Sequence, residues 1–131
     1  MVVAFYVEIW NRGNVDAARD LLTEAFVFRG SLGAAAEGRA GFVAYVRSTR
    51  SALADYHCEI LECVAEGDRA FAKMRFSGQH VGVFRGHAPT AKSVHWLGAA
   101  LFQFEGPRIT QLWVLGDLAG LDALLEANLA E

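Results

Sequence analysis

The sequence predicts one domain of the α+β class, with helices in its first half and a largely antiparallel sheet in its second. Apolar residues recur at helical spacing before Asp55 and in shorter, alternating patterns after it. Turn residues separate four later segments that are rich in β-branched and aromatic side chains. Helices followed by a run of strands are typical of the α+β class. The length of 131 residues suits a single domain over residues 1–131.

The first half is expected to contain three helices and one short strand. An amphipathic helix opens the chain, and Gly13 supplies the left-handed residue that ends it. A short second helix covers residues 15–22, and the strand covers 26–28. A loop of small residues over 30–38 leads into a third helix that reaches about residue 53. The apolar face of the first helix consists of Val2, Phe5, Tyr6, Ile9 and Trp10.

The second half is expected to contain four strands and a closing helix. Gly67 and Gly106 mark two of the turns between strands. The closing helix follows Asp117 and covers residues 118–129. The predicted strands cover residues 56–65, 70–83, 94–105 and 109–116.

The alternation of residues assigns faces to two of these strands. In the second strand Met74 lies on an apolar face, and the same register places His80 on that face. In the last strand an uninterrupted alternation from Ile109 places Trp113 and Asp117 on one face. A carboxylate at the end of an apolar face is unusual, so Asp117 is the first candidate for an acid–base group.

Composition and charge exclude several classes of function. The net charge is -3 and the basic residues are scattered, so no nucleic-acid partner is expected. No apolar run approaches a membrane span, and the N-terminus lacks the order of a signal peptide, so the cytoplasm is the expected location, with no membrane partner. The hydrophobic fraction of 53% is high for a small domain. A partner subunit, an apolar interior pocket, or both would account for it.

Several familiar site motifs are absent from the sequence. It has no glycine-rich dinucleotide fingerprint and no phosphate loop. Cys58 and Cys63 fit no zinc or redox spacing. The four histidines have no metal-ligand spacing, so we expect neither a metal nor a cofactor.

The last third of the chain carries a family resemblance. The segments concerned are Pro89-Thr90-Ala91-Lys92, Val94-His95-Trp96, Phe102-Gln103-Phe104-Glu105, Arg108-Ile109-Thr110-Gln111-Leu112-Trp113, Asp117, Gly120-Leu121 and Leu124-Leu125. This pattern resembles the C-terminal half of the SnoaL-like polyketide cyclases, within the nuclear-transport-factor-2-like superfamily. Near the N-terminus, Phe5-Tyr6 and Trp10-Asn11-Arg12-Gly13-Asn14 match the first helix and turn of the same family. The chain departs from the family pattern at Ala91, where glycine is usual, and at Gln103, where arginine is usual.

The resemblance implies a strongly curved, mostly antiparallel sheet wrapped around a pocket that three N-terminal helices close. It implies a cofactor-free acid–base enzyme acting on an apolar carbonyl compound, by intramolecular aldol ring closure. Ketosteroid-isomerase-like proton transfer is one alternative, and a non-enzymatic small-molecule-binding or dimerisation module is another. The family commonly pairs through the outer face of its sheet, so a homodimer is expected.

The candidate site residues also have plain structural interpretations. Asp117 would act as the base, but it also stands where an N-cap of the last helix belongs. His95 and His80 are candidate donors to an enolate oxygen, although buried histidines more often serve structure. The candidate substrate-binding residues are Trp113, Trp96, Met74, Tyr6 and Tyr45.

Overall fold

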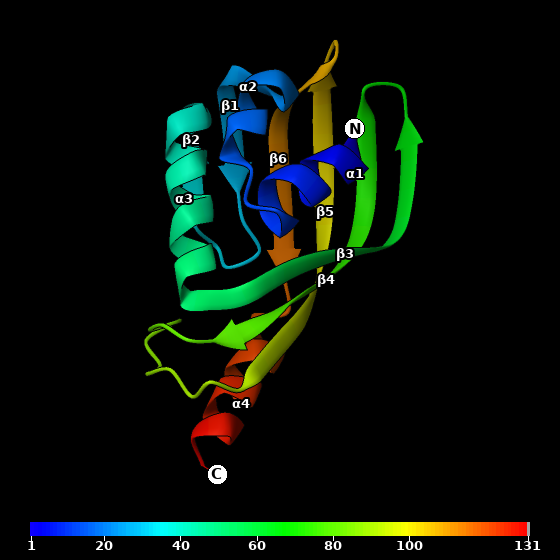
Figure 1. Ribbon diagram of the computed structural model, residues 1–131. Helices are drawn as coiled ribbons and strands as arrows, with labels where there is room; N and C mark the ends of the chain where they lie inside the picture. The colour runs from blue at the N-terminus through cyan, green and yellow to red at the C-terminus, as the bar shows by residue number, and fades with distance from the viewer. Residues whose placement is uncertain (131) are drawn as a thin grey trace.

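A computed structural model, which describes residues 1–130, has the α+β architecture expected from the sequence (Figure 1). Six strands form one sheet in the order β2-β1-β6-β5-β4-β3. Only β1 and β6 pair in parallel, and every other neighbouring pair is antiparallel. The helical segments are α1 (Val2–Ala4), η1 (Phe5–Asn11), η2 (Val15–Ala17), α2 (Ala18–Leu21), α3 (Gly38–Ala52) and α4 (Leu118–Leu129). The strands are β1 (Leu22–Arg29), β2 (Ala35–Glu37), β3 (Leu53–Glu66), β4 (Arg69–His80), β5 (Ser93–Glu105) and β6 (Arg108–Gly116).

The helices before the long strands cover one face of the sheet. Figure 1 shows α1, α2 and α3 on the same side of the strands, while α4 lies at the opposite end of the molecule from the N-terminus. The strands β3 and β4 bend strongly along their length, so the sheet curves around the helices. The core therefore lies between the concave face of the sheet and these helices. Among residues 1–130, none of the helices combines the length and the apolar character that crossing a bilayer requires.

The first helical segment differs from the expected α-helix. Residues Phe5–Asn11 form a π-helix, in which backbone N–H groups bond five residues back. The N–H of Arg12, for example, donates to the carbonyl oxygen of Val7 at 3.0 Å. This wider turn places Phe5, Tyr6, Ile9 and Trp10 in the core together.

Several boundaries also differ from expectation. The first strand begins at Leu22 and is longer than the predicted 26–28, and the predicted loop over 30–38 contains the short strand β2. The strand β4 ends at His80, three residues earlier than predicted, because Val81 and Gly82 turn away and donate to the carbonyl oxygen of Ala52.

The register of β6 is the main correction to the expected faces. Ile109 is buried as predicted, but Trp113 is 49% exposed and Leu112 and Val114 are the buried residues. The pairing with β5 shifts at Thr110, since Gln103 pairs with Gln111 and Phe104 pairs with Ile109. This extra residue is a β-bulge, and it reverses the inward and outward alternation after it. The prediction that Ile109 and Trp113 share a face was therefore wrong.

Candidate functional site

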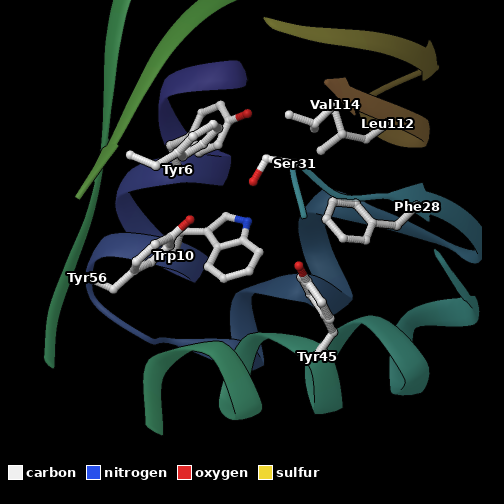
Figure 2. Close-up of a pocket in the computed structure, with 9 residues that line it drawn as sticks. Tyr6, Trp10, Phe28, Ser31, Tyr45, Tyr56, Leu112 and Val114 are labelled. Carbon is white, nitrogen blue, oxygen red and sulfur yellow. The ribbon is translucent and has the colours of Figure 1, made fainter. Parts of the chain in front are cut away.

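A small cavity lies between the N-terminal helices and the concave face of the sheet (Figure 2). Its volume, taken as the space open to the centre of a water molecule, is about 20 Å³. By this measure it holds about one water molecule. Aromatic rings make up most of its wall, and the lining residues are Tyr6, Trp10, Phe28, Ser31, Tyr45, Tyr56, Phe76, Leu112 and Val114.

Four hydroxyl groups line this otherwise apolar cavity. The Tyr56 hydroxyl lies close to the Cys58 side chain. The Ser31 hydroxyl accepts a hydrogen bond of 3.3 Å from the indole N–H of Trp96. The Tyr6 hydroxyl is fully buried and has no hydrogen-bond partner among the described residues. Because an unpaired buried hydroxyl is costly, Tyr6 is the group in the cavity that would gain most from a bound acceptor.

The end of the π-helix is held firmly, which fixes the direction of Tyr6. The side chain of Asn11 donates to the carbonyl oxygen of Cys58 at 3.1 Å and accepts from the N–H of Cys58 at 2.7 Å. The guanidinium of Arg50, from α3, donates to the carbonyl oxygens of Trp10 and Asn11. The helix is thus joined both to β3 and to α3, and Tyr6 is held on the side that faces the cavity.

The Ser31 loop is pressed against the end of β6. A Cβ atom built on Gly116 would stand only 2.5 Å from the carbonyl oxygen of Ser31. Only glycine at this position allows the close approach. Figure 2 shows the Ser31 hydroxyl in the middle of the cavity, between Trp10 and the β6 side chains Leu112 and Val114.

Burial keeps the cavity hydroxyls protonated. It raises the pKa of Tyr6 and of Tyr56 well above the ordinary value, and it raises the pKa of Tyr45 to a smaller degree. The three phenols are therefore neutral hydrogen-bond donors at neutral pH. None of the nine lining residues is a carboxylate, a histidine or a lysine, so this cavity offers donors and contains no general base of the usual kind.

Asp117 does not line this cavity. It is solvent-exposed, and its Oδ1 atom accepts a hydrogen bond of 3.0 Å from the N–H of Gly120. It is thus the N-cap of α4, which is the structural interpretation of its position. The displaced register of β6 places it on the outer side, away from Leu112 and Val114.

Two other candidates lie on the outer face of the sheet. His95 is exposed on β5. Trp113 lies against the guanidinium of Arg29, which is 5.6 Å from the centre of the indole ring. Neither residue reaches the cavity, so the expectation that Trp113 forms a pocket wall in this chain is corrected by the bulge in β6.

His80 is buried on the apolar face of β4, as the alternation predicts. Its Nε2 atom lies 3.2 Å from the carbonyl oxygen of His87. Since a carbonyl oxygen only accepts, Nε2 carries the proton and Nδ1 is left as a buried lone pair without a partner among the described residues. The ring of Phe84 lies between His80 and Trp96, and His80 does not line the cavity.

The remaining candidates divide between cavity and core. Tyr6 and Tyr45 line the cavity, whereas Trp96 and Met74 are buried in the core behind it. Trp96 still contributes indirectly, because it holds the Ser31 hydroxyl. Sequence reasoning missed Ser31, Trp10 and Tyr56 as cavity residues.

In the part of the chain that the structure describes, no group of three or more His, Cys, Asp or Glu side chains is arranged to hold a metal ion.

The fold and the hydroxyl-lined cavity together define a small α+β domain of the nuclear-transport-factor-2-like class, whose curved sheet encloses an apolar site. The family model described as SnoaL-like polyketide cyclase matches residues 1–125. The chain belongs to the SnoaL-like polyketide cyclase family.

Solved structures of other proteins have the same fold. A candidate polyketide cyclase from Acidithiobacillus ferrooxidans is similar with a TM-score of 0.86 and 24% identity, over 97% of this chain and 92% of the other. TsrD from Streptomyces laurentii has a TM-score of 0.85 and 26% identity, over 96% and 92% of the two chains. A protein from Catenulispora acidiphila with a ketosteroid isomerase-like fold, solved with trimethylamine, has a TM-score of 0.79 and 20% identity, over 93% and 88%. No curated protein matches the sequence.

Proposed function

We propose that this protein is a cyclase-like enzyme that binds an apolar carbonyl compound and polarises its carbonyl group through Tyr6. The observation that supports this proposal is the Tyr6 hydroxyl, which is buried, neutral and without a partner in an aromatic-lined cavity. A carbonyl oxygen placed there would accept its hydrogen bond. As the substrate forms an enolate, the charge on that oxygen grows, and a donor in a dry site stabilises it more than it stabilises the ground state.

The proposed reaction is an intramolecular aldol closure. The substrate loses a proton from the carbon between two carbonyl groups, which is the most acidic position, and the proton passes to water. The enolate oxygen is held by the Tyr6 hydroxyl. The enolate carbon then forms a bond to a second carbonyl carbon of the same molecule, and the resulting alkoxide takes a proton from water. No oxidant, reductant or cofactor is needed for this sequence of steps.

Asp117, His95 and His80 stay predictions as acid–base groups. Their side chains are not among those that line the cavity. A catalytic Asp117 would have to leave the N–H of Gly120, which it caps at 3.0 Å, before it could accept a proton from a bound substrate. The proposal therefore rests on Tyr6 as the hydrogen-bond donor, and the same experiment tests Asp117 as the base.

Exchange of acidic protons tests the proposal directly. The probe is 2-tetralone in D₂O, whose exchange at the carbon between ring and carbonyl is followed by NMR. We expect the protein to accelerate exchange over buffer. Tyr6→Phe should lower the rate about 10²–10³-fold, the usual loss for one oxyanion donor. Asp117→Asn keeps the helix cap, since asparagine caps a helix about as well as aspartate, and it therefore tests the predicted base role of Asp117 without a loss of stability.

Three results would change the conclusion. A loss of about 10²–10⁴-fold in Asp117→Asn would transfer the base role to Asp117, because this is the range for one general base. Equal rates in wild type and Tyr6→Phe would exclude Tyr6 as the donor. Saturable binding of 2-tetralone without any accelerated exchange would favour the second candidate function, a small-molecule-binding module. The absence of a carboxylate or imidazole among the nine lining residues is the observation that favours that second function.

We also propose that the protein forms a homodimer through the outer face of its sheet and works in the cytoplasm. Large apolar side chains of three neighbouring strands are exposed in one row, because Phe71 pairs with Leu101 and Leu101 pairs with Trp113. Leu97 and Leu115, each 50% exposed, extend the same face. Exposed apolar patches of this kind mark association sites. The interface should bury roughly 1,600 Å² or more in total. Sedimentation at micromolar concentration should show a dimer, and a monomer would contradict the proposal.

A further inference from the structure

A second, larger hollow lies beside the C-terminal half of the helix α3. Its volume is about 390 Å³ by the measure used for the inner cavity. It lies between the second half of α3, the loop after β1 and the segment that follows β4. The lining residues are Leu32, Ala34, Tyr45, Ser48, Thr49, Ser51, Ala52, Gly82, Val83, Phe84 and Arg85. We call this hollow the outer groove.

Tyr45 is the residue that lines both the inner cavity and the outer groove. It is also the exception in the wall of the cavity, because the other eight lining residues are buried and Tyr45 is only partly so. Figure 2 shows its ring rising from α3, with the hydroxyl directed into the cavity beside Phe28. The path of least displacement between solvent and the inner cavity therefore passes the Tyr45 side chain.

The inner cavity is too small for an organic ligand unless part of its wall moves. Sites for small organic ligands have volumes of about 300–1,000 Å³, whereas the inner cavity has room for about one water molecule at 20 Å³. A ring system enters only if part of the wall moves. Gly30 leaves little room beside the tyrosine, since a Cβ built there would lie 3.1 Å from the Tyr45 hydroxyl. Rotation of Tyr45 toward the groove is the movement that joins the two spaces without displacing a strand.

The chemistry of the outer groove differs from that of the cavity. Ser48, Thr49 and Ser51 supply hydroxyl groups from α3. Arg85 supplies a cation that is held in place by Asp122 of α4, with Nε and Nη2 at 2.7 and 2.9 Å from the two carboxylate oxygens. Its Nη1 atom has no hydrogen-bond partner in the described part of the chain. The groove thus suits an oxygen-rich or anionic group, while the cavity suits an apolar ring with one carbonyl.

We propose that the outer groove is the second half of the ligand site, that it binds the carboxylate or oxygen-rich end of an elongated aromatic ketone, and that Tyr45 is the movable partition between the two halves. This inference rests on the proposed function, because it assumes that the inner cavity binds the carbonyl-bearing ring. It adds the class of substrate: a molecule with an apolar ketone at one end and a polar end at the other.

Binding kinetics of two probes test the partition. One is 2-tetralone, which is compact and neutral, and the other is anthraquinone-2-carboxylate, which is longer and anionic. Association is followed by stopped-flow quenching of tryptophan fluorescence. If the open position of Tyr45 is a minor state of 10% or less, Tyr45→Ala should raise the association rate of both probes about tenfold or more. Val83→Trp should lower it, since it fills the groove. Val3→Trp, an equally bulky change at an exposed valine outside both spaces, is the matched control and should have no effect.

Variants that change the charge of Arg85 or of its partner Asp122 test whether the outer groove binds an anionic group. Arg85→Gln should weaken anthraquinone-2-carboxylate about tenfold, the loss of one charge-assisted hydrogen bond, and leave 2-tetralone unchanged. Asp122→Asn removes the same ion pair but keeps the cation, so it should not weaken the anionic probe. A loss of equal size for both probes in Arg85→Gln would overturn the assignment of the polar end.

Variants of the inner cavity separate this inference from the proposed function. Val114→Phe, checked for folding by circular dichroism, and Tyr6→Phe both change the cavity without touching the groove. If they alter binding while Tyr45→Ala and Val83→Trp do not, the ligand enters elsewhere and the inference fails alone. If neither inner variant alters the binding of either probe, the ligand does not occupy the cavity, and the proposed function fails together with the inference.

Discussion

Both faces of the sheet carry large apolar side chains, yet the two faces differ in what covers them. On the inner face, Leu112 and Val114 of β6 are buried and form part of the cavity wall. On the outer face of the same strand, Trp113 and Leu115 are about half exposed, at 49% and 50%. Residues that follow one another in the sequence thus alternate between a closed site and an open surface. Hydrophobicity alone does not tell which face is the core, and a single bulge at Thr110 decides it.

The difference between the faces lies in their polar neighbours. The inner face meets neutral hydroxyls whose pKa values burial has raised. The outer face carries charged side chains between its apolar ones: Arg75 pairs across the strands with both Glu59 and Leu97, and Lys73 pairs with Glu62. A charge is tolerated on the outer face because water or a partner's polar groups reach it. The inner face has no comparable compensation.

Placing an aspartate on each face should have the largest effect of our predictions. Val114→Asp should lower the free energy of unfolding by about 3–5 kcal/mol, the cost of an uncompensated buried charge. Leu115→Asp should change the monomer's stability by less than about 0.5 kcal/mol, as for most surface changes, and should dissociate the proposed dimer. Urea unfolding and sedimentation of both variants measure this. Similar losses of stability in the two variants would show that the faces are not distinct in the way described.

Alkaline pH should lower the free energy of unfolding gradually, through the buried groups of the inner face. Burial raises the pKa of Tyr6 and Tyr56 above 10.0 and that of the Cys58 thiol above 9.0. The unfolded chain loses these protons at lower pH than the folded chain does. The stability that the groups contribute is therefore complete below about pH 9 and is lost as the pH rises further, by about 1.4 kcal/mol per pH unit for each group.

Urea unfolding of wild type and Tyr6→Phe between pH 8 and 11 measures this dependence. The variant should lose stability less steeply above pH 10, because it lacks one of the three groups. Leu97→Ala, a change on the outer face, is the control and should shift the stability without changing its slope against pH. Identical slopes in wild type and Tyr6→Phe would contradict the burial of the Tyr6 hydroxyl.

The cap of α4 should give the smallest effect. Asp117→Ala should lower the free energy of unfolding by about 1 kcal/mol, and Asp117→Asn should leave it nearly unchanged. Glu126→Ala, at an exposed position within the same helix, is the control for a simple change of charge. Thermal unfolding of the three variants measures the order. If Asp117→Ala were as stable as wild type, the hydrogen bond to the N–H of Gly120 would contribute nothing to the fold.

Most of the fold could be predicted from the sequence because its signals are local. The turns at Gly67 and Gly106 are confirmed, and both glycines have a positive φ, at 57° and 58°. The strand β2 could not be predicted, since Ala35–Glu37 has no β-branched or aromatic residue and pairs only because β1 lies beside it. The register of β6 depends on a bulge that no pattern in the sequence indicates.

The candidate site could be predicted only in part. Tyr6 was found through the periodicity of its helix, which survives the change from α to π. Ser31 and Tyr56 were missed because nothing in their local sequence distinguishes them from an ordinary loop serine and an ordinary strand tyrosine. Their place in the cavity follows from contacts with distant residues, such as the bond from Trp96 to Ser31 across 65 positions. Asp117 attracted attention through its type and position, and both are also explained by its role as a cap.

The π-helix at Phe5–Asn11 makes the direction of the Tyr6 hydroxyl depend on the number of residues in each helical turn. A π-helix fits one more residue into a turn than an α-helix does, and each residue of an α-helix turns the chain by about 100°. A return of this segment to an α-helix without loss of a residue would therefore turn Tyr6 around the helix axis relative to Trp10. Loss of one codon between them together with that return would leave the two side chains in nearly the same relative direction. Every aromatic side chain of the cavity would be encoded in both cases, yet the donor would point elsewhere in the first. Among relatives, the spacing of these two residues is therefore informative only together with the type of helix that joins them.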